Sequence, residues 1–161
     1  MKVFGLEQGE SGIGILEQSS RRRGSSGRAE SKVTVPDNEL QLQLPPDHDQ
    51  SRVLREKIRE WCSAQGYPDP YVDDVVLVAS ELFSNAVQAT IGDASITVGL
   101  TRRHDGALVR IINEGPGFDP GSLSAPRTDR AGGRGIWLAK SLGTLGVTQH
   151  QSTTIVSVVV G

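Results

Sequence analysis

The sequence predicts an α+β fold, a two-layer sandwich in which a mixed, mostly antiparallel sheet is covered on one face by helices. Two stretches, 54–62 and 71–90, repeat apolar residues at the spacing of a helix. The later stretches 96–112 and 154–160 instead alternate apolar and polar residues with the period of a strand. Turn signals stand between successive strands, so neighbouring strands are expected to run antiparallel with the helices on one face.

The folded part is expected to begin with a short strand and a helix. Residues 40–44 alternate leucine with glutamine, which is typical of a half-buried strand, and two prolines end it. Either Asp47 or Asp49 can then cap a helix. The apolar stripe of this helix consists of Leu54, Ile58, Trp61 and Cys62.

The predicted helix at 71–90 carries the clearest pair of polar groups in the chain. Its apolar stripe consists of Val72, Val75, Val76, Ala79, Leu82, Phe83 and Ala86. Glu81 and Asn85 are four residues apart, so they are neighbours on one face of the helix. A carboxylate beside an amide can hold a hydrated cation and accept a proton. A solvated helix face is the plainer alternative.

The second half of the chain is expected to hold four strands and a short helix. Asp105-Gly106 is a hairpin turn signal between the first two strands. The long loop that follows is rich in Gly, Pro and Ser, which favours a mobile lid, with a merely disordered loop as the alternative. The expected elements are strands at 96–100 and 108–112, the loop at 115–133, a helix at 135–142, and strands at 145–147 and 154–160.

The composition predicts one domain preceded by a tail. Within the 161 residues, residues 1–36 are rich in Gly, Ser, Glu and Arg, so we expect a disordered low-complexity tail before a folded domain at 37–161. The run at 21–23 is all arginine and could touch nucleic acid or an acidic partner, but nearby acidic residues favour a solvated tail. The first residues lack the apolar run of a signal peptide, so a cytoplasmic protein is expected.

Charge and cysteine content exclude several classes of function. The net charge of −2 does not support broad binding to nucleic acid or to an anionic membrane. Cys62 is the single cysteine, which excludes an intramolecular disulfide and a cysteine-based zinc site. Because it falls on an apolar helical stripe, Cys62 is expected to be a small buried hydrophobe and not a nucleophile.

A glycine-rich turn follows Asn113 at the end of the strand 108–112. Gly115 and Gly117 flank a proline, which lets the backbone turn sharply and approach a ligand without a Cβ in the way. A ligand-binding loop and a plain turn explain this pattern about equally well.

A second glycine cluster, Gly132-Gly133-Arg134-Gly135, leads directly into the helix at 135–142. The free N–H groups at a helix N-terminus bind phosphate well, and the arginine could add a charged donor. A flexible loop is the alternative. The segment Ser152-Thr153-Thr154-Ile155 stands at the start of the last strand, where a threonine hydroxyl could reach the edge of a base, although threonine is also common in strands.

Taken in this order and spacing, the segments resemble the GHKL superfamily of ATP-binding domains, named for gyrase, Hsp90-type chaperones, histidine kinases and MutL. Within it, the chain looks most like small bacterial anti-sigma serine kinases. The resemblance covers about residues 38–160 and implies a Bergerat-type, histidine kinase-like ATPase fold. The matching segments are Glu81–Val87 (N box), Asn113–Gly117 (G1 box), Gly133–Leu138 (G2 box) and Ser152–Ile155 (the final Gly-Thr-Thr-Val motif).

The resemblance implies ATP and Mg²⁺ as ligands and a role for each matching residue. Glu81 would be the general base, and Asn85 would bind Mg²⁺ through its side-chain oxygen. The residues expected to hold the adenine are Asn113, Gly115, Gly117 and Thr153. Those expected to seat the phosphates are Gly133, Arg134 and Gly135.

The chain departs from the family pattern at three places. The family has Asp where this chain has Asn113, and a neutral acceptor is expected to weaken ATP binding about tenfold. Ser152 replaces a glycine, and the segment 88–90 replaces the Arg-His-Ala of many relatives. A degenerate member that binds nucleotide poorly or not at all therefore stays open.

The resemblance implies an anti-sigma factor and protein serine/threonine kinase that phosphorylates a small anti-antagonist protein. Its expected partners are a sigma factor and that anti-antagonist, and a homodimer is a further expectation from the family. The alternative is a non-catalytic binding module that sequesters a sigma factor or another regulator. The ATPase part of a histidine kinase is disfavoured, because His48, His104 and His150 fall in predicted loops or strand ends.

Overall fold

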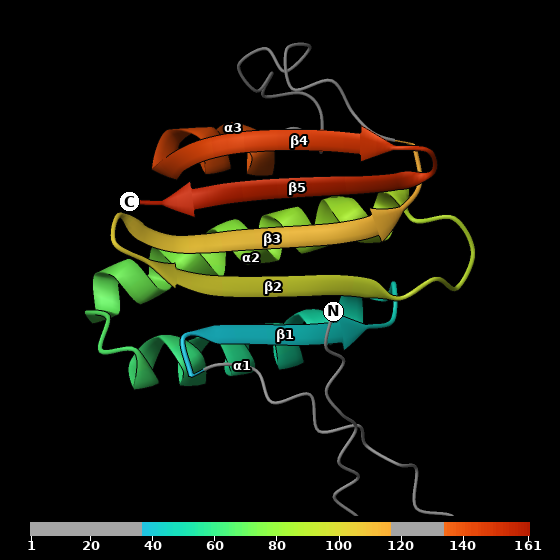
Figure 1. Cartoon of the computed structure of the whole chain (residues 1–161). Helices are drawn as coiled ribbons and strands as arrows, with labels where there is room; N and C mark the ends of the chain where they lie inside the picture. Colours follow the sequence, from blue (N-terminus) through green and yellow to red (C-terminus); the bar gives the residue numbers. More distant parts are fainter. Residues whose placement is uncertain (1–36, 117–133) are drawn as a thin grey trace, which may run out of the picture. The chain divides into compact units, whose positions relative to one another are not determined.

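The structure, a computed structural model, describes residues 37–116 and 134–161, which form the predicted α+β fold (Figure 1). In chain order the elements are β1 (Glu39–Leu44), the 3-10 helix η1 (His48–Gln50), α1 (Ser51–Ala64), α2 (Asp69–Ala89), β2 (Ile96–Arg103), β3 (Gly106–Glu114), α3 (Arg134–Leu142), β4 (Gly143–His150) and β5 (Thr153–Val160). The predictions that concern the tail at 1–36 and the loop residues 117–133 lie outside the described residues.

The five strands form one sheet in the order β1-β2-β3-β5-β4 (Figure 1). Every strand pair among the described residues is antiparallel, in agreement with the predicted mostly antiparallel sheet, and none of these pairs is parallel. β3 and β5 are neighbours although α3 and β4 separate them in the sequence. Their register pairs Asn113 with Thr154 and Glu114 with Thr153, so two predicted motifs meet at one end of the sheet.

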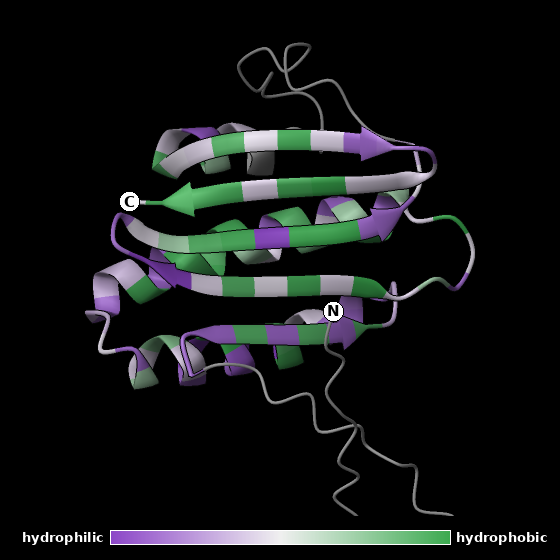
Figure 2. Cartoon of the chain, viewed as in Figure 1, coloured by the Kyte–Doolittle hydropathy of each residue, from purple (hydrophilic) through white to green (hydrophobic). Residues whose placement is uncertain are grey.

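Helices cover one face of this sheet (Figure 1). α2 packs against β2, β3 and β5, α3 packs against α2, β4 and β5, and α1 packs against α2. Figure 2 shows the alternation of apolar and polar residues along β1 and β2, which turns the apolar set toward the helices. Within 37–116 and 134–161, no helix combines the length and the apolar character that a membrane span requires.

The predicted helix around 54–62 is α1, and η1 precedes it. The carboxylate of Asp47 caps η1 and accepts a hydrogen bond from the backbone N–H of Asp49 at 2.9 Å. Of the two predicted capping residues, Asp47 is therefore the acceptor. α1 itself begins at Ser51 without a side-chain cap, and its four predicted stripe residues are buried.

α2 is the central helix and follows its predicted pattern. All seven predicted stripe residues are buried, together with Val78. The helix begins at Asp69, two residues before the predicted start at 71, because Pro70 fits the first turn of a helix, where an N–H has no helical partner. At its end, the N–H and the hydroxyl of Thr90 both donate to the carbonyl of Ala86, at 2.8 and 2.6 Å.

Cys62 lies on the buried face of α1, in the core, with no exposed surface. Burial raises the pKa of its thiol to about 11, so the thiol stays protonated near neutral pH. The prediction that Cys62 is a small buried hydrophobe is confirmed.

Tyr71 connects the first turn of α2 to the sheet. Its hydroxyl donates to the carbonyl of Val160, at the end of β5, and accepts from the N–H of Ala107, at the start of β3, at 2.6 Å. Its ring lies against Tyr67, with ring centroids 4.8 Å apart. One side chain therefore fixes α2 against both central strands.

Tyr71→Phe is expected to lower the free energy of unfolding by about 1–3 kcal/mol, because the partly buried N–H and carbonyl lose their partner. Chemical denaturation measures this loss. Tyr67→Phe is the control, since the hydroxyl of Tyr67 makes one longer bond, 3.3 Å to the carbonyl of Gly106. Equal losses in the two variants would contradict the role given to Tyr71.

Candidate functional site

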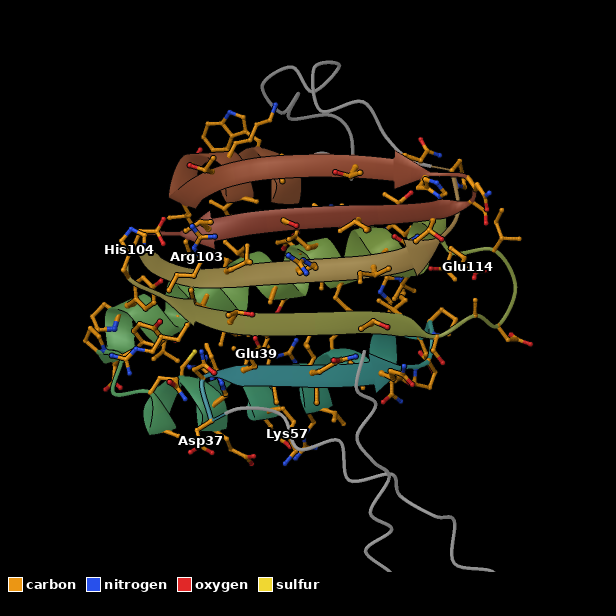
Figure 3. The ribbon with its side chains drawn as sticks, viewed as in Figure 1. Asp37, Glu39, Lys57, Arg103, His104 and Glu114 are labelled. Atoms are coloured by element: carbon orange, nitrogen blue, oxygen red, sulfur yellow. The ribbon has the colours of Figure 1, made fainter. Side chains whose placement is uncertain are left out.

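A small pocket lies between α2 and the adjoining ends of β3 and β5. It is lined by Leu82, Asn85, Ala86, Ala89, Asn113, Pro116, Thr154 and Val156. Figure 3 helps to locate it: Glu114 marks this end of β3, and Arg103 and His104 mark the opposite end of the sheet. The pocket volume is about 20 Å³, enough for one water molecule and too small for a purine. A nucleotide therefore needs the pocket to open.

Asn113 and Asn85 both present an unpartnered amide to this pocket. Asn113 faces the helices because it continues the alternation of Val109 and Ile111, and its exposed fraction is 4%. Among the described residues, the Nδ2 atoms of Asn113 and Asn85 are buried without a hydrogen-bond partner. Each such group costs about 1–3 kcal/mol, so two in one pocket favour a polar ligand there.

Glu81 stands one helical turn before Asn85. Four residues of helix span about 6 Å along the axis, so the carboxylate and the amide lie on the same face of α2. Glu81 is partly buried and does not line the pocket itself. The predicted pair is therefore together on one helix face, with Asn85 at the pocket and Glu81 beside it.

Gly115 is the point where the end of β3 meets the end of α2. A Cβ at this position would lie 2.0 Å from the carbonyl oxygen of Ala89, a distance that only glycine permits. The N–H of Gly115 donates to the carbonyl of Ser152 at 2.7 Å, and its carbonyl accepts from the hydroxyl of Thr154 at 3.2 Å. These contacts fix the positions of α2, β3 and β5 around the pocket.

Thr154, and not Thr153, brings its side chain to the pocket. In β5 the residues alternate between the two faces of the sheet, and Thr154 shares the buried face with Val156 and Val158. Thr153 points to the other face and does not line the pocket. The alternation was visible in the sequence and is the signal that identifies Thr154.

The predicted phosphate segment is described only in part. Gly133 and Gly117 lie outside the described residues. Arg134 and Gly135 form the first turn of α3, one residue earlier than the predicted start of that helix. Since α3 packs against α2, the start of this helix belongs to the same helical layer as Asn85.

A second hollow lies on the opposite, uncovered face of the sheet. It has a volume of about 180 Å³ and is lined by residues of β1, β2 and β3, including Gln41, Gly99 and Arg110. It contains none of the predicted site residues. The smaller pocket, with its buried amides, is therefore the candidate site despite its size.

The family comparison matches most of the chain. The model of the histidine kinase-like ATPase domain matches residues 44–158. The chain belongs to this family. The resemblance to the GHKL superfamily that the motifs predict is thereby confirmed. A search of the curated proteins finds no match to the chain.

Solved structures share the fold of this histidine kinase-like ATPase domain. The RsbU and RsbW domains of a Mycobacterium tuberculosis protein match with a TM-score of 0.58 and 22% identity over 74% of this chain, which spans only 31% of that chain. The SiaB–SiaC complex from Pseudomonas aeruginosa matches with a TM-score of 0.54 and 15% identity, over 75% of this chain and 88% of that chain. At these identities the likeness shows the fold alone.

Histidine kinase-like ATPase domains bind ATP, generally with Mg²⁺, and the pocket of this member fits a nucleotide base in its chemistry. Its unpartnered amide N–H groups match the ring-nitrogen acceptors of a purine, and its apolar residues match the faces of the ring. Among the described residues, no group of three or more His, Cys, Asp or Glu side chains is placed so that it could hold a metal ion. The side-chain oxygen of Asn85, at this pocket, is of the kind that Mg²⁺ accepts alongside phosphate and water oxygens.

Gly115→Ala is expected to lower the free energy of unfolding by about 1–3 kcal/mol, because the new methyl group must displace the carbonyl of Ala89. Denaturant titration measures the change. Gly146→Ala on β4 is the matched control, since no atom lies within 4 Å of its added Cβ. If the two variants were equally stable, the close approach at Gly115 would not constrain the fold.

Proposed function

We propose that this chain binds Mg-ATP in the pocket and acts as an anti-sigma regulator with protein serine kinase activity. The single observation that carries the proposal is the meeting of two unpartnered buried amides, Asn85 and Asn113, in one pocket of an ATPase-family fold. The order of the four motifs, which resembles that of anti-sigma serine kinases, supports the choice within the family.

In this proposal, the base enters between α2 and β3. Asn113 meets the polar edge of the base, and Thr154 takes over the contact first expected of Thr153. Its hydroxyl already donates to the carbonyl of Gly115, so its oxygen remains able to accept a hydrogen bond. Gly115 and Gly117 give the backbone its close approach to the base.

The phosphates would extend from the base toward the start of α3. The free N–H groups of that helix terminus attract anions, and Gly133, Arg134 and Gly135 supply the backbone and charge for this contact. Asn85 would hold Mg²⁺ by its side-chain oxygen. The metal, when bound, supplies positive charge that offsets the charge of the phosphates.

Glu81 is the proposed general base. Its carboxylate accepts the proton of an attacking hydroxyl, either the serine of a protein substrate or water. Its place one turn before Asn85 puts it beside the proposed metal ligand without filling the base pocket. Proton transfer by a positioned base typically contributes about 10²–10⁴-fold to a rate.

The proposed partners are a sigma factor and a small anti-antagonist protein, which would be the phosphorylated substrate. The folds of an RsbW domain and of SiaB in its complex with SiaC support a regulator that works through protein partners. A homodimer in the cytoplasm is part of the same proposal.

A second candidate function is a non-catalytic binding module that sequesters a sigma factor or another regulator. Two observations favour it: Asn113 stands where the resemblance calls for a carboxylate, and the pocket has room for only about one water molecule. This module would bind its partner with little or no nucleotide.

Glu81→Gln tests the kinase proposal. The full chain is titrated with Mg-ATP by calorimetry, and slow phosphate release to water is measured with the same protein. The variant is expected to bind Mg-ATP with less than about a threefold change in affinity and to release phosphate at least about 100-fold more slowly, because the amide cannot accept the proton.

Glu114→Gln is the control, since this carboxylate is exposed and does not line the pocket. Unchanged phosphate release in Glu81→Gln would remove Glu81 as the base. Mg-ATP binding without phosphate release in the wild type would favour the binding module.

A further inference from the structure

The polar side chains that line the pocket are all neutral: two primary amides, which can both donate and accept, and one hydroxyl, which already donates to the carbonyl of Gly115. Among the described residues, these are Asn85, Asn113 and Thr154. The other described lining residues are apolar: Leu82, Ala86, Ala89, Pro116 and Val156. No described carboxylate or cationic side chain lines the pocket, so no described side chain there carries a charge that restricts it to accepting or to donating.

The two common kinds of purine differ at position 6 in whether the group there donates or accepts a hydrogen bond. A 6-aminopurine such as adenine presents an N–H donor there and an acceptor at N1. A 6-oxopurine presents an acceptor oxygen and an N–H donor at N1. A carboxylate can only accept, so it bonds the amino group and repels the oxygen, whereas a primary amide can offer its oxygen or its nitrogen.

The hydrogen bonds that Asn113 makes with a base matter for affinity because its amide is buried. It is almost fully buried, its neighbour across the sheet is Thr154, and its Nδ2 has no partner among the described residues. With a 6-aminopurine, its oxygen can accept from the amino group while its nitrogen donates to a ring nitrogen. With a 6-oxopurine, its nitrogen donates to the oxygen while its own oxygen accepts from N1–H. Both arrangements satisfy the amide.

We infer that this pocket binds 6-oxopurine nucleotides with an affinity close to that for ATP, and that Asn113 is the residue that sets this broad selectivity. The inference rests on the proposed function, because it takes the base to lie beside Asn113. It goes further by naming the substrate class, purine nucleotides with either group at position 6.

Mg-ATP and Mg-ITP are the probes, since inosine differs from adenosine only in the exchange of the amino group for an oxygen and its ring proton. Each is titrated by calorimetry into the full wild-type chain and into Asn113→Asp. In the wild type, the two dissociation constants are expected to agree within about tenfold. In Asn113→Asp, the affinity for ATP is expected to rise about tenfold and the affinity for ITP to fall about tenfold. The ratio of the two dissociation constants therefore shifts by about 100-fold.

Thr154→Val is the matched control from the same pocket. It is expected to weaken the binding of both nucleotides by a similar factor and to leave the ratio of their dissociation constants within about threefold of the wild type. The change removes a hydroxyl that already donates to the carbonyl of Gly115 and leaves the amide of Asn113 intact. A role for Asn113 in stability alone would likewise leave the ratio unchanged. Circular dichroism on heating confirms that each variant is folded before titration.

Several outcomes would overturn the inference. If the wild type binds ATP more than about 100-fold more tightly than ITP, the inference fails while the proposed function stands. This measurement needs no variant. If the ratio of the ATP and ITP dissociation constants is unchanged in a folded Asn113→Asp variant, the inference likewise fails while the proposed function stands. If neither nucleotide binds the folded wild type or the folded variant, the proposed function fails and the inference fails with it.

Discussion

The contact between Gly115 and the carbonyl of Ala89 is the constraint on which the site depends. β3 ends and α2 ends at this point, and the two backbones come closer than any side chain would allow. The N–H of Ile91 donates to the carbonyl of Glu114 at 3.0 Å, which continues the contact along the chain. Because the end of α2 is held against the sheet here, Asn85 faces the same small space as Asn113.

The consequence is a small pocket in which two amide nitrogens and a hydroxyl group are buried. The Nδ2 atoms of Asn85 and Asn113 are buried without a hydrogen-bond partner among the described residues, and Thr154 is 2% exposed. A ligand that supplies the missing acceptors therefore recovers energy that the empty fold has lost. The same closeness limits the space, so binding requires α2, β3 or Pro116 to move.

The fold and part of the site were predictable from the sequence because they follow from local periodicity. The apolar stripe of α2 and the alternation in β2 each predict which face is buried. The order of the motifs indicated Asn85 and Asn113 as candidate site residues. Two features were not predictable, since they depend on contacts between distant segments: the closeness at Gly115 and the small pocket. Which of Thr153 and Thr154 lines the pocket is different, because the alternation of β5 already puts the two side chains on opposite faces of the sheet.

The central claim is that a purine nucleotide binds at the two buried amides. Nuclear magnetic resonance of the side-chain NH₂ groups tests it most directly, since each amide gives its own pair of signals. On addition of Mg-ATP, the signals of Asn85 and Asn113 are expected to shift, while those of Gln41 and Gln43 on β1, outside this pocket, stay in place. Shifts confined to β1, with the two asparagine signals unmoved, would contradict the account.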